Sequence, residues 1–176
     1  MRKGFTLIEI LVVSGIMVMF SLTIVSLFLS TIRGNTKTQV IQKVRQDGDF
    51  ALKTMTRLIK QAESVAVDSD CTGIAGDSIV VNDIYDGVAT FSLIDYDPGV
   101  GEDLIPRIAS TSGGTDFFLS GIKVNTSSLN FTCYQRGSGN QIVTISFTLT
   151  IGAGAGMQAQ EKEEQDFKTS VSLRKY

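Results

Sequence analysis

The chain has 176 residues, of which 43% are apolar and 19% charged, and its formal net charge is −2. That length suits one modest domain, and the near-neutral charge excludes the broad basic surface of a nucleic-acid-binding domain. Histidine is absent, which excludes Ser-His-Asp and Cys-His catalysis and removes the commonest nitrogen ligand of zinc.

The charges are distributed unevenly along the chain. Residues 1–32 carry a formal charge of +1, residues 33–65 carry +4, and residues 66–176 carry −7. Thirteen of the seventeen glycines and both prolines also follow residue 65. We therefore divide the chain into an apolar N-terminal segment (1–32), an amphipathic helix (33–65) and a β-rich head (66–176).

The first long feature is an uncharged run over residues 10–32. About 20 apolar residues cross a bilayer as a helix, so the run is long enough to span one. A buried core helix is the alternative, but it would show a polar face, and this run has only scattered Ser, Thr and Gly. Arg2 and Lys3 precede the run, which predicts an N-terminus in the cytoplasm and a head outside the membrane.

The residues that open this helix form a recognisable signal. Residues 3–9 read KGFTLIE, and no A-x-A-like cleavage site follows the apolar run. The motif resembles the class III signal of type IV pilins and type II secretion pseudopilins. The resemblance implies that residues 1–4 are a leader that a prepilin peptidase removes by cleaving after Gly4, that Phe5 becomes N-methylated, and that residues 5–32 remain as transmembrane and assembly helix. It implies other pilin subunits and an inner-membrane assembly platform as partners, and neither a cofactor nor a catalytic residue.

Glu9 would be the fifth residue of the cleaved chain. A carboxylate at the edge of an apolar helix is costly unless it is paired, and the α-amino group of Phe5 would lie one helical turn away on the same face. In the resembling family a neighbour's amino group is thought to reach this carboxylate, which implies that Glu9 sets the register between subunits. A carboxylate that rests unpaired among lipid headgroups is the alternative.

After Arg33, apolar residues recur at spacings of three, four and seven, which predicts one buried helix face. We expect one continuous helix from about Phe5 to about Val65, with a sheet packed on its second half; a free coiled coil is the alternative. Gly34 and Gly48 are expected to bend or loosen it. The stripe consists of Ile41, Val44, Ala51, Met55, Leu58, Ala62 and Val65, widened by Leu52 and Ile59.

The remaining 111 residues read mostly as strands and turns, so the sequence predicts an α+β fold with an antiparallel sheet. Asp86-Gly87 predicts a turn between the first two strands, and residues 136–140 predict a hairpin loop. The predicted strands are 78–81, 88–94, 117–119, 122–124, 128–134, 142–151 and 167–173.

Two groups of side chains in the head are candidate sites. Cys71 and Cys133 are the only cysteines, so outside the membrane they allow one disulfide; two reduced, buried cysteines are the alternative. A loop with four carboxylates is a weak Ca²⁺ candidate, although its spacing departs from the EF-hand pattern and a solvated acidic turn is the preferred interpretation. These carboxylates are Asp95, Asp97, Glu102 and Asp103.

Two further segments extend the family resemblance. Residues 45–62 are similar to the W class of minor pilins and to minor pseudopilin J of type II secretion, and residues 167–174 resemble the last strand of many minor pilins. This implies a structural minor subunit, in or at the tip of a type IV pilus. A type II secretion or DNA-uptake pseudopilus is the alternative, and the −7 charge of the head argues against direct DNA binding. A signal-anchored envelope enzyme is the second alternative, which the missing histidine disfavours.

Overall fold

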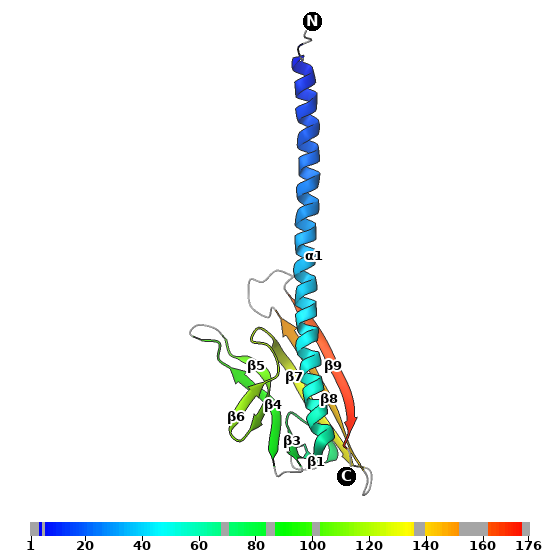
Figure 1. The fold of residues 1–176 in the computed structure, drawn as a ribbon, viewed down its shortest axis with the longest axis vertical. Helices are drawn as coiled ribbons and strands as arrows, with labels where there is room; N and C mark the ends of the chain where they lie inside the picture. Colours follow the sequence, from blue (N-terminus) through cyan, green and yellow to red (C-terminus); the bar gives the residue numbers. More distant parts are fainter. Residues whose placement is uncertain are drawn as a thin grey trace.

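The computed structural model describes residues 4, 6–67, 71–83, 87–99, 103–135, 140–151 and 162–173. They form one long helix followed by two antiparallel sheets, which confirms the predicted α+β class (Figure 1). The elements are α1 (Leu7–Gln61), β1 (Ala62–Ala66), β2 (Thr72–Gly76), β3 (Ile79–Asp83), β4 (Val88–Tyr96), β5 (Ile105–Ser112), β6 (Thr115–Phe118), β7 (Asn125–Gln135), β8 (Gln141–Ile151) and β9 (Glu163–Ser172).

The strands of the head belong to two sheets rather than one. The first sheet has the order β1-β3-β4-β5-β6, and the second has the order β2-β7-β8-β9. Because β1 and β2 lie in different sheets, the chain crosses from the first sheet to the second between Ala66 and Thr72 and returns after β2. The first half of α1 projects beyond the head, and its second half lies along the strands (Figure 1).

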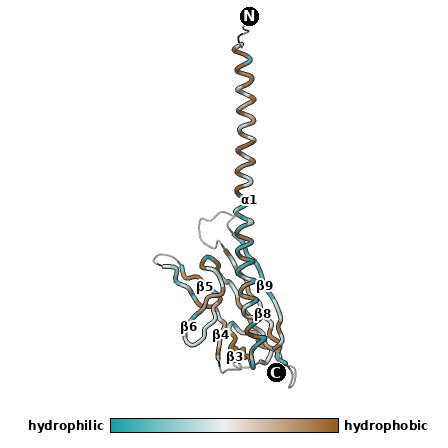
Figure 2. The backbone as a smooth tube through the Cα atoms, viewed as in Figure 1, coloured by the Kyte–Doolittle hydropathy of each residue, from teal (hydrophilic) through white to brown (hydrophobic). Residues whose placement is uncertain are grey.

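The helix α1 has 55 residues and is therefore about 82 Å long at 1.5 Å per residue. Figure 2 shows the change in composition along it, from a hydrophobic projecting half to a largely hydrophilic second half beside the sheets. The continuous helix is thus confirmed, and α1 passes through Gly34 and Gly48 without a break.

The predicted end of the helix is wrong by four residues. The helix α1 ends at Gln61, and residues 62–65 belong to β1. A bulge between Ala62 and Ser64 shifts the register of β1 against β3, so that Ala62 and Val65 are both buried three positions apart. A bulged strand thus imitates the helical spacing, and the apolar stripe alone could not reveal the change of element.

The buried face of α1 is built around a glycine. The side of the helix that packs on the head buries Val44, Gly48, Ala51, Met55 and Ile59. The ring of Phe167 in β9 lies so close to Gly48 that an added methyl group would overlap it. Phe167 in turn stacks on Phe147 in β8, with ring centroids 5.1 Å apart and planes at 19°. Gly48 therefore serves close packing of the helix on the second sheet.

The predicted strands agree with six of the observed ones, and three strands were missed. The segment 122–124 is wrong, because residues 122 and 123 form a turn before β7. The strands β3 and β4 pair as a hairpin, as do β7 and β8, although Asp86 and residues 136–139 lie outside the described residues. The missed strands are β1, β2 and β5.

Pro106 explains why the sequence pattern did not predict the strand β5. Proline cannot donate a ladder hydrogen bond and therefore argues against a central strand. In the structure Pro106 faces Asp95 of β4, whereas β6 pairs with β5 only from Ala109 onwards. The proline thus occupies a part of β5 that pairs with β4 on one side and lies beyond the end of the β6 ladder.

We predict that Gly48→Ala lowers the free energy of unfolding by about 1–3 kcal/mol, because the methyl group would overlap the Phe167 ring and overpacking costs that much. Gly34→Ala is the matched control, since nothing lies within 4 Å of the atom it would add. An exposed helical alanine is favoured over glycine by about 1 kcal/mol. Urea unfolding of both full-length variants in detergent, followed by circular dichroism, measures the difference. Equal stabilities would contradict the packing role of Gly48.

Candidate assembly surface

The first half of α1 is an apolar surface that none of the other described residues buries. Every residue from Leu7 to Asn35 is exposed. The stretch Leu7–Ile32 is about 39 Å long at 1.5 Å per residue, which exceeds the roughly 30 Å of bilayer hydrocarbon. Within the described part of the chain, α1 is the one helix long and apolar enough to cross a membrane.

Five of the six hydroxyl groups between Leu7 and Ile32 are satisfied inside the helix, Ser30 being the exception. Each of the five donates a hydrogen bond of 2.7–3.3 Å to a carbonyl three or four residues earlier in α1. An unpaired hydroxyl group in an apolar medium would cost several kcal/mol, whereas these five hydroxyl groups already have a carbonyl acceptor. The scattered polar residues are therefore compatible with an apolar environment; they are Ser14, Ser21, Thr23, Ser26 and Thr31.

Thr6 and Glu9 define the start of the helix. The backbone N–H of Glu9 donates to the Thr6 hydroxyl at 3.4 Å and to the Thr6 carbonyl at 3.1 Å. Thr6 is the N-cap residue, and its spacing to Glu9 is that of a capping box. The carboxylate of Glu9 lies in the first turn, where the helix dipole favours a negative charge. Glu9 therefore helps to start α1, in addition to its expected role between subunits.

Thr6 is the functional residue of this segment that the sequence reasoning missed, although the T-x-x-E pattern signals it. Gly4, which precedes the predicted cleavage site, is exposed. Nothing lies within 4 Å of the position that an added side-chain atom would take there. Phe5 lies outside the described residues. Glu9 is exposed, and no described cation lies within 4 Å of its carboxylate.

Polar contacts fix the second half of α1 to the head. The carboxylate of Asp47 accepts a hydrogen bond of 3.1 Å from the backbone N–H of Gly121, in the loop between β6 and β7. Lys43 lies 3.8 Å from the same carboxylate, one turn earlier on the helix. Lys37 forms an ion pair of 3.6 Å with Glu163 at the start of β9. Asp47 thus fixes the helix to the loop between β6 and β7, and Lys37 fixes it to β9 of the second sheet.

Arg107 of β5 holds the same loop from the other side. Its guanidinium lies 4.9 Å from the ring centroid of Tyr96 and 4.3 Å from that of Phe118, and two of its nitrogens donate to the carbonyl of Ser120. Burial lowers the pKa of Arg107, while Tyr96 and Asp47 act in the opposite direction. An arginine stays charged under these conditions, so it fastens the loop that also binds Asp47.

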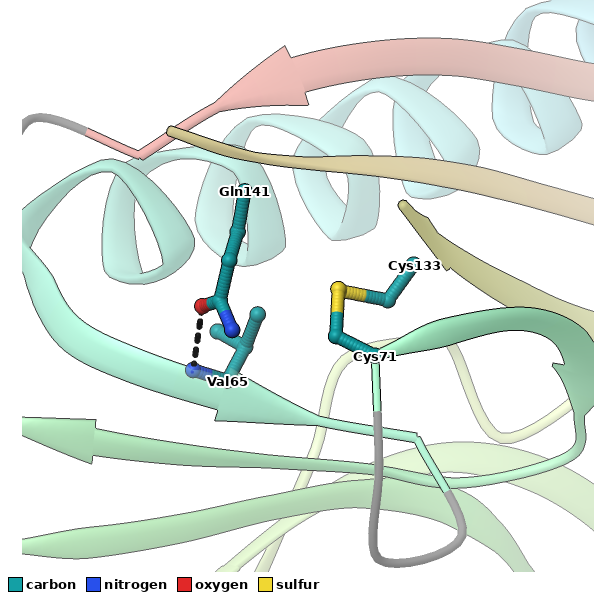
Figure 3. Close-up of a disulfide and its surroundings, with 4 residues drawn as sticks. All are labelled: Val65, Cys71, Cys133 and Gln141. Atoms are coloured by element: carbon teal, nitrogen blue, oxygen red, sulfur yellow. Dashed lines mark hydrogen bonds between the residues drawn. A yellow bond between two sulfur atoms is a disulfide. The ribbon is translucent and has the colours of Figure 1, made fainter. Parts of the chain in front are cut away.

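The two cysteines form a disulfide within the second sheet, with their Cα atoms 4.8 Å apart (Figure 3). Cys133 is fully buried in β7, and Cys71 stands directly before β2. Nearby, the backbone N–H of Val65 in β1 donates to the side-chain carbonyl of Gln141 in β8 at 3.1 Å (Figure 3). The hydrogen bond of Val65 therefore fixes the chain before it crosses from the first sheet to the second, and the disulfide of Cys71 fixes it after the crossing.

The acidic loop is not arranged as a calcium site in the described residues. Asp97 accepts a hydrogen bond of 2.9 Å from the backbone N–H of Gly99, which is a turn contact within the loop. Asp95, Asp97 and Asp103 are exposed, and Glu102 lies outside the described residues. No group of three or more His, Cys, Asp or Glu among the described residues could hold a metal ion.

Replacing both cysteines, as Cys71→Ala with Cys133→Ala, is expected to lower the free energy of unfolding by about 4 kcal/mol. The disulfide closes a loop with a sequence separation of 62, and the chain-entropy model assigns that much to a loop of this length. Urea titrations of the oxidised wild type, the reduced wild type and the double variant would measure it. Reduction should destabilise the wild type and leave the variant unchanged; a variant as stable as the oxidised protein contradicts the prediction.

Comparisons with known proteins do not assign this chain to a family. No family model, no curated protein and no solved structure matches it. Its role must be inferred from the chain itself, which offers an exposed apolar helix, a capped start with one carboxylate, and a cross-linked head.

Proposed function

We propose that this chain is a structural, non-catalytic minor subunit of a type IV pilus, assembled into the filament or at its tip. The observation that carries the proposal is the exposed apolar half of a continuous helix whose first residues, Leu7 to Glu9, are the last three of the KGFTLIE motif. A soluble enzyme has no use for such a surface, whereas a subunit that is first held in a bilayer and then packed among like helices requires it.

The exposed half of α1 serves both stages of this function. In the cytoplasmic membrane its side chains lie among lipid tails, with the basic leader inside and the head outside. When the helix leaves the bilayer, the same side chains can avoid water only by packing against the apolar halves of neighbouring helices. Hydrophobic burial between helices then supplies the main association energy, and Glu9 supplies the register because an unpaired carboxylate there is costly.

The proposal includes a short series of partners. A prepilin peptidase removes residues 1–4 after Gly4 and the new amino group of Phe5 is methylated. An inner-membrane assembly platform then moves the processed subunit from the lipid bilayer into contact with other pilin subunits. The acidic head faces outward on the cell surface or caps the tip, and its charge of −7 disfavours direct contact with nucleic acid.

Mass spectrometry of the protein isolated from its own host tests this proposal. We expect a mature chain that begins at Phe5 and carries one methyl group on its α-amino nitrogen. Gly4→Leu is expected to block the cleavage while leaving the head folded, because Gly4 contacts nothing in the described structure. Finding an intact Met1 on the wild-type chain would sink the pilin interpretation.

The role of Glu9 is tested with two variants that separate charge from helix capping. Glu9→Ala removes both the carboxylate and the capping partner, whereas Glu9→Gln keeps a side chain that suits this capping position. If the carboxylate pairs with a neighbour's amino group, both variants are cleaved and both enter filaments poorly, as measured by the shed filament fraction. Normal incorporation of Glu9→Gln would refute the register role and leave only the cap.

A further inference from the structure

The strand β2 adds no side chain to the hydrophobic core. It lies at the edge of the second sheet and pairs with β7 alone. The three residues of β2 that have side chains, Thr72, Ile74 and Ala75, are all exposed, with Ile74 at 72%. The other two residues, Gly73 and Gly76, have none. The contacts of β2 with the rest of the head are therefore made mainly by its backbone.

The backbone pairing of β2 is irregular. A bulge between Thr72 and Ala75 shifts its register against β7. Within this bulge Gly73 has a φ of +89° and lies under the ring of Tyr134, which is itself half-exposed. The net gain from one backbone hydrogen bond is no larger than the cost of ordering one residue. Pairing along one edge, without buried side chains, therefore gives β2 little stability of its own.

The disulfide supplies the attachment that β2 lacks. Cys71 directly precedes β2, and its bond to Cys133 joins the start of this strand to the buried face of β7 (Figure 3). The nearest described core residues along the chain are Val67, before the crossing, and Ile79, at the start of β3. Among the described residues between these two, Cys71 has the one hydrophobic side chain that packs against the core.

We propose that the disulfide is a redox-sensitive fastening for β2, which a dithiol reductant opens by thiol–disulfide exchange. A thiolate of the reductant bonds to one cysteine sulfur and displaces the other, and the second thiolate of the reductant then displaces the first cysteine. The two protons lost by the reductant end on the cysteines, so the products are two thiols and a cyclic disulfide. The strand β2 then separates from β7 while both sheets stay folded, and reoxidation fastens it again.

The burial of the two cysteines determines which sulfur is attacked. Cys133 is fully buried, whereas Cys71 is partly exposed. A thiolate from solvent therefore reaches the sulfur of Cys71 first, and Cys133 is the leaving group. The exchange thus begins at the end of the disulfide that adjoins β2.

The release of β2 changes the surface of the second sheet. It uncovers the backbone edge of β7 at Phe131–Tyr134, where β2 is paired in the oxidised chain. An uncovered strand edge presents unpaired N–H and C=O groups to other chains. Oxidation of the head therefore closes an edge that is open in the reduced chain. The inference goes beyond the filament function, because it concerns two states of the head itself.

Hydrogen exchange of the full-length protein in detergent micelles, measured by mass spectrometry, tests the fastening. Oxidised protein is compared with protein reduced by dithiothreitol, and with the same protein reoxidised after the reductant is removed. We expect the amides of β2 to exchange about tenfold or more faster after reduction and to regain their protection on reoxidation. The amides of β8, which has a strand on each side, should remain protected at times when β2 has exchanged.

The variant Cys71→Ala with Cys133→Ala separates the covalent bond from any other effect of the reductant. Its β2 amides should exchange as fast as those of the reduced wild type, and dithiothreitol should not change them. Protection of β2 that survives reduction of the wild type would overturn the proposal. Simultaneous loss of protection in β2 and β8 would also overturn it, because the whole head would then open rather than one strand.

The order of attack is tested with a monothiol. A short reaction of the oxidised protein with glutathione is stopped with acid, and the mixed disulfide is located by peptide mass spectrometry. We expect the glutathione on Cys71 and the free thiol on Cys133. Glutathione found first on Cys133 would contradict the assignment of Cys71 as the accessible sulfur.

Discussion

The close approach of Phe167 to the backbone of α1 at Gly48 is the contact on which the rest of the structure depends. It determines how near the helix lies to β8 and β9, and the stacked ring of Phe147 extends the same contact into the sheet. The buried residues on either side of Gly48 then join the same core as the strands of the head. The direction of the projecting half follows from the same contact.

One helix thus meets two environments in succession. Its first half pairs five of its six hydroxyl groups within the helix and carries no charge after Glu9 until Arg33, which suits a surface without water. Its second half has one face packed on the head. Asp47 on this half and Arg107 in β5 both bind the loop between β6 and β7. The change occurs within a single uninterrupted element, so the projecting half of α1 and the head are joined by a continuous helix rather than through a linker.

The sequence predicted those features that depend on local composition and period. The apolar run, the amphipathic stripe and the alternating strands β4, β7 and β8 follow from spacing alone. Features that depend on contacts between distant segments were not accessible. Gly48 looked like a flexible point because its partner, Phe167, is 119 positions away in the sequence. The strand β1 looked helical because of its bulge, β5 was hidden by Pro106, and the buried Arg107 gave no pattern at all.

The direct passage from α1 into β1 has a mechanical consequence. A pull along the helix axis is borne first by the packed second half of α1, which then continues into β1 at Gln61 and Ala62 without a loop between the two elements. If β1 were drawn away from β3, the chain could lengthen only as far as Cys71, which is covalently joined to Cys133 in the centre of the second sheet. At about 3.4 Å per residue, that limits the extension to roughly 30 Å. The disulfide therefore limits how far tension on α1 can unravel the head.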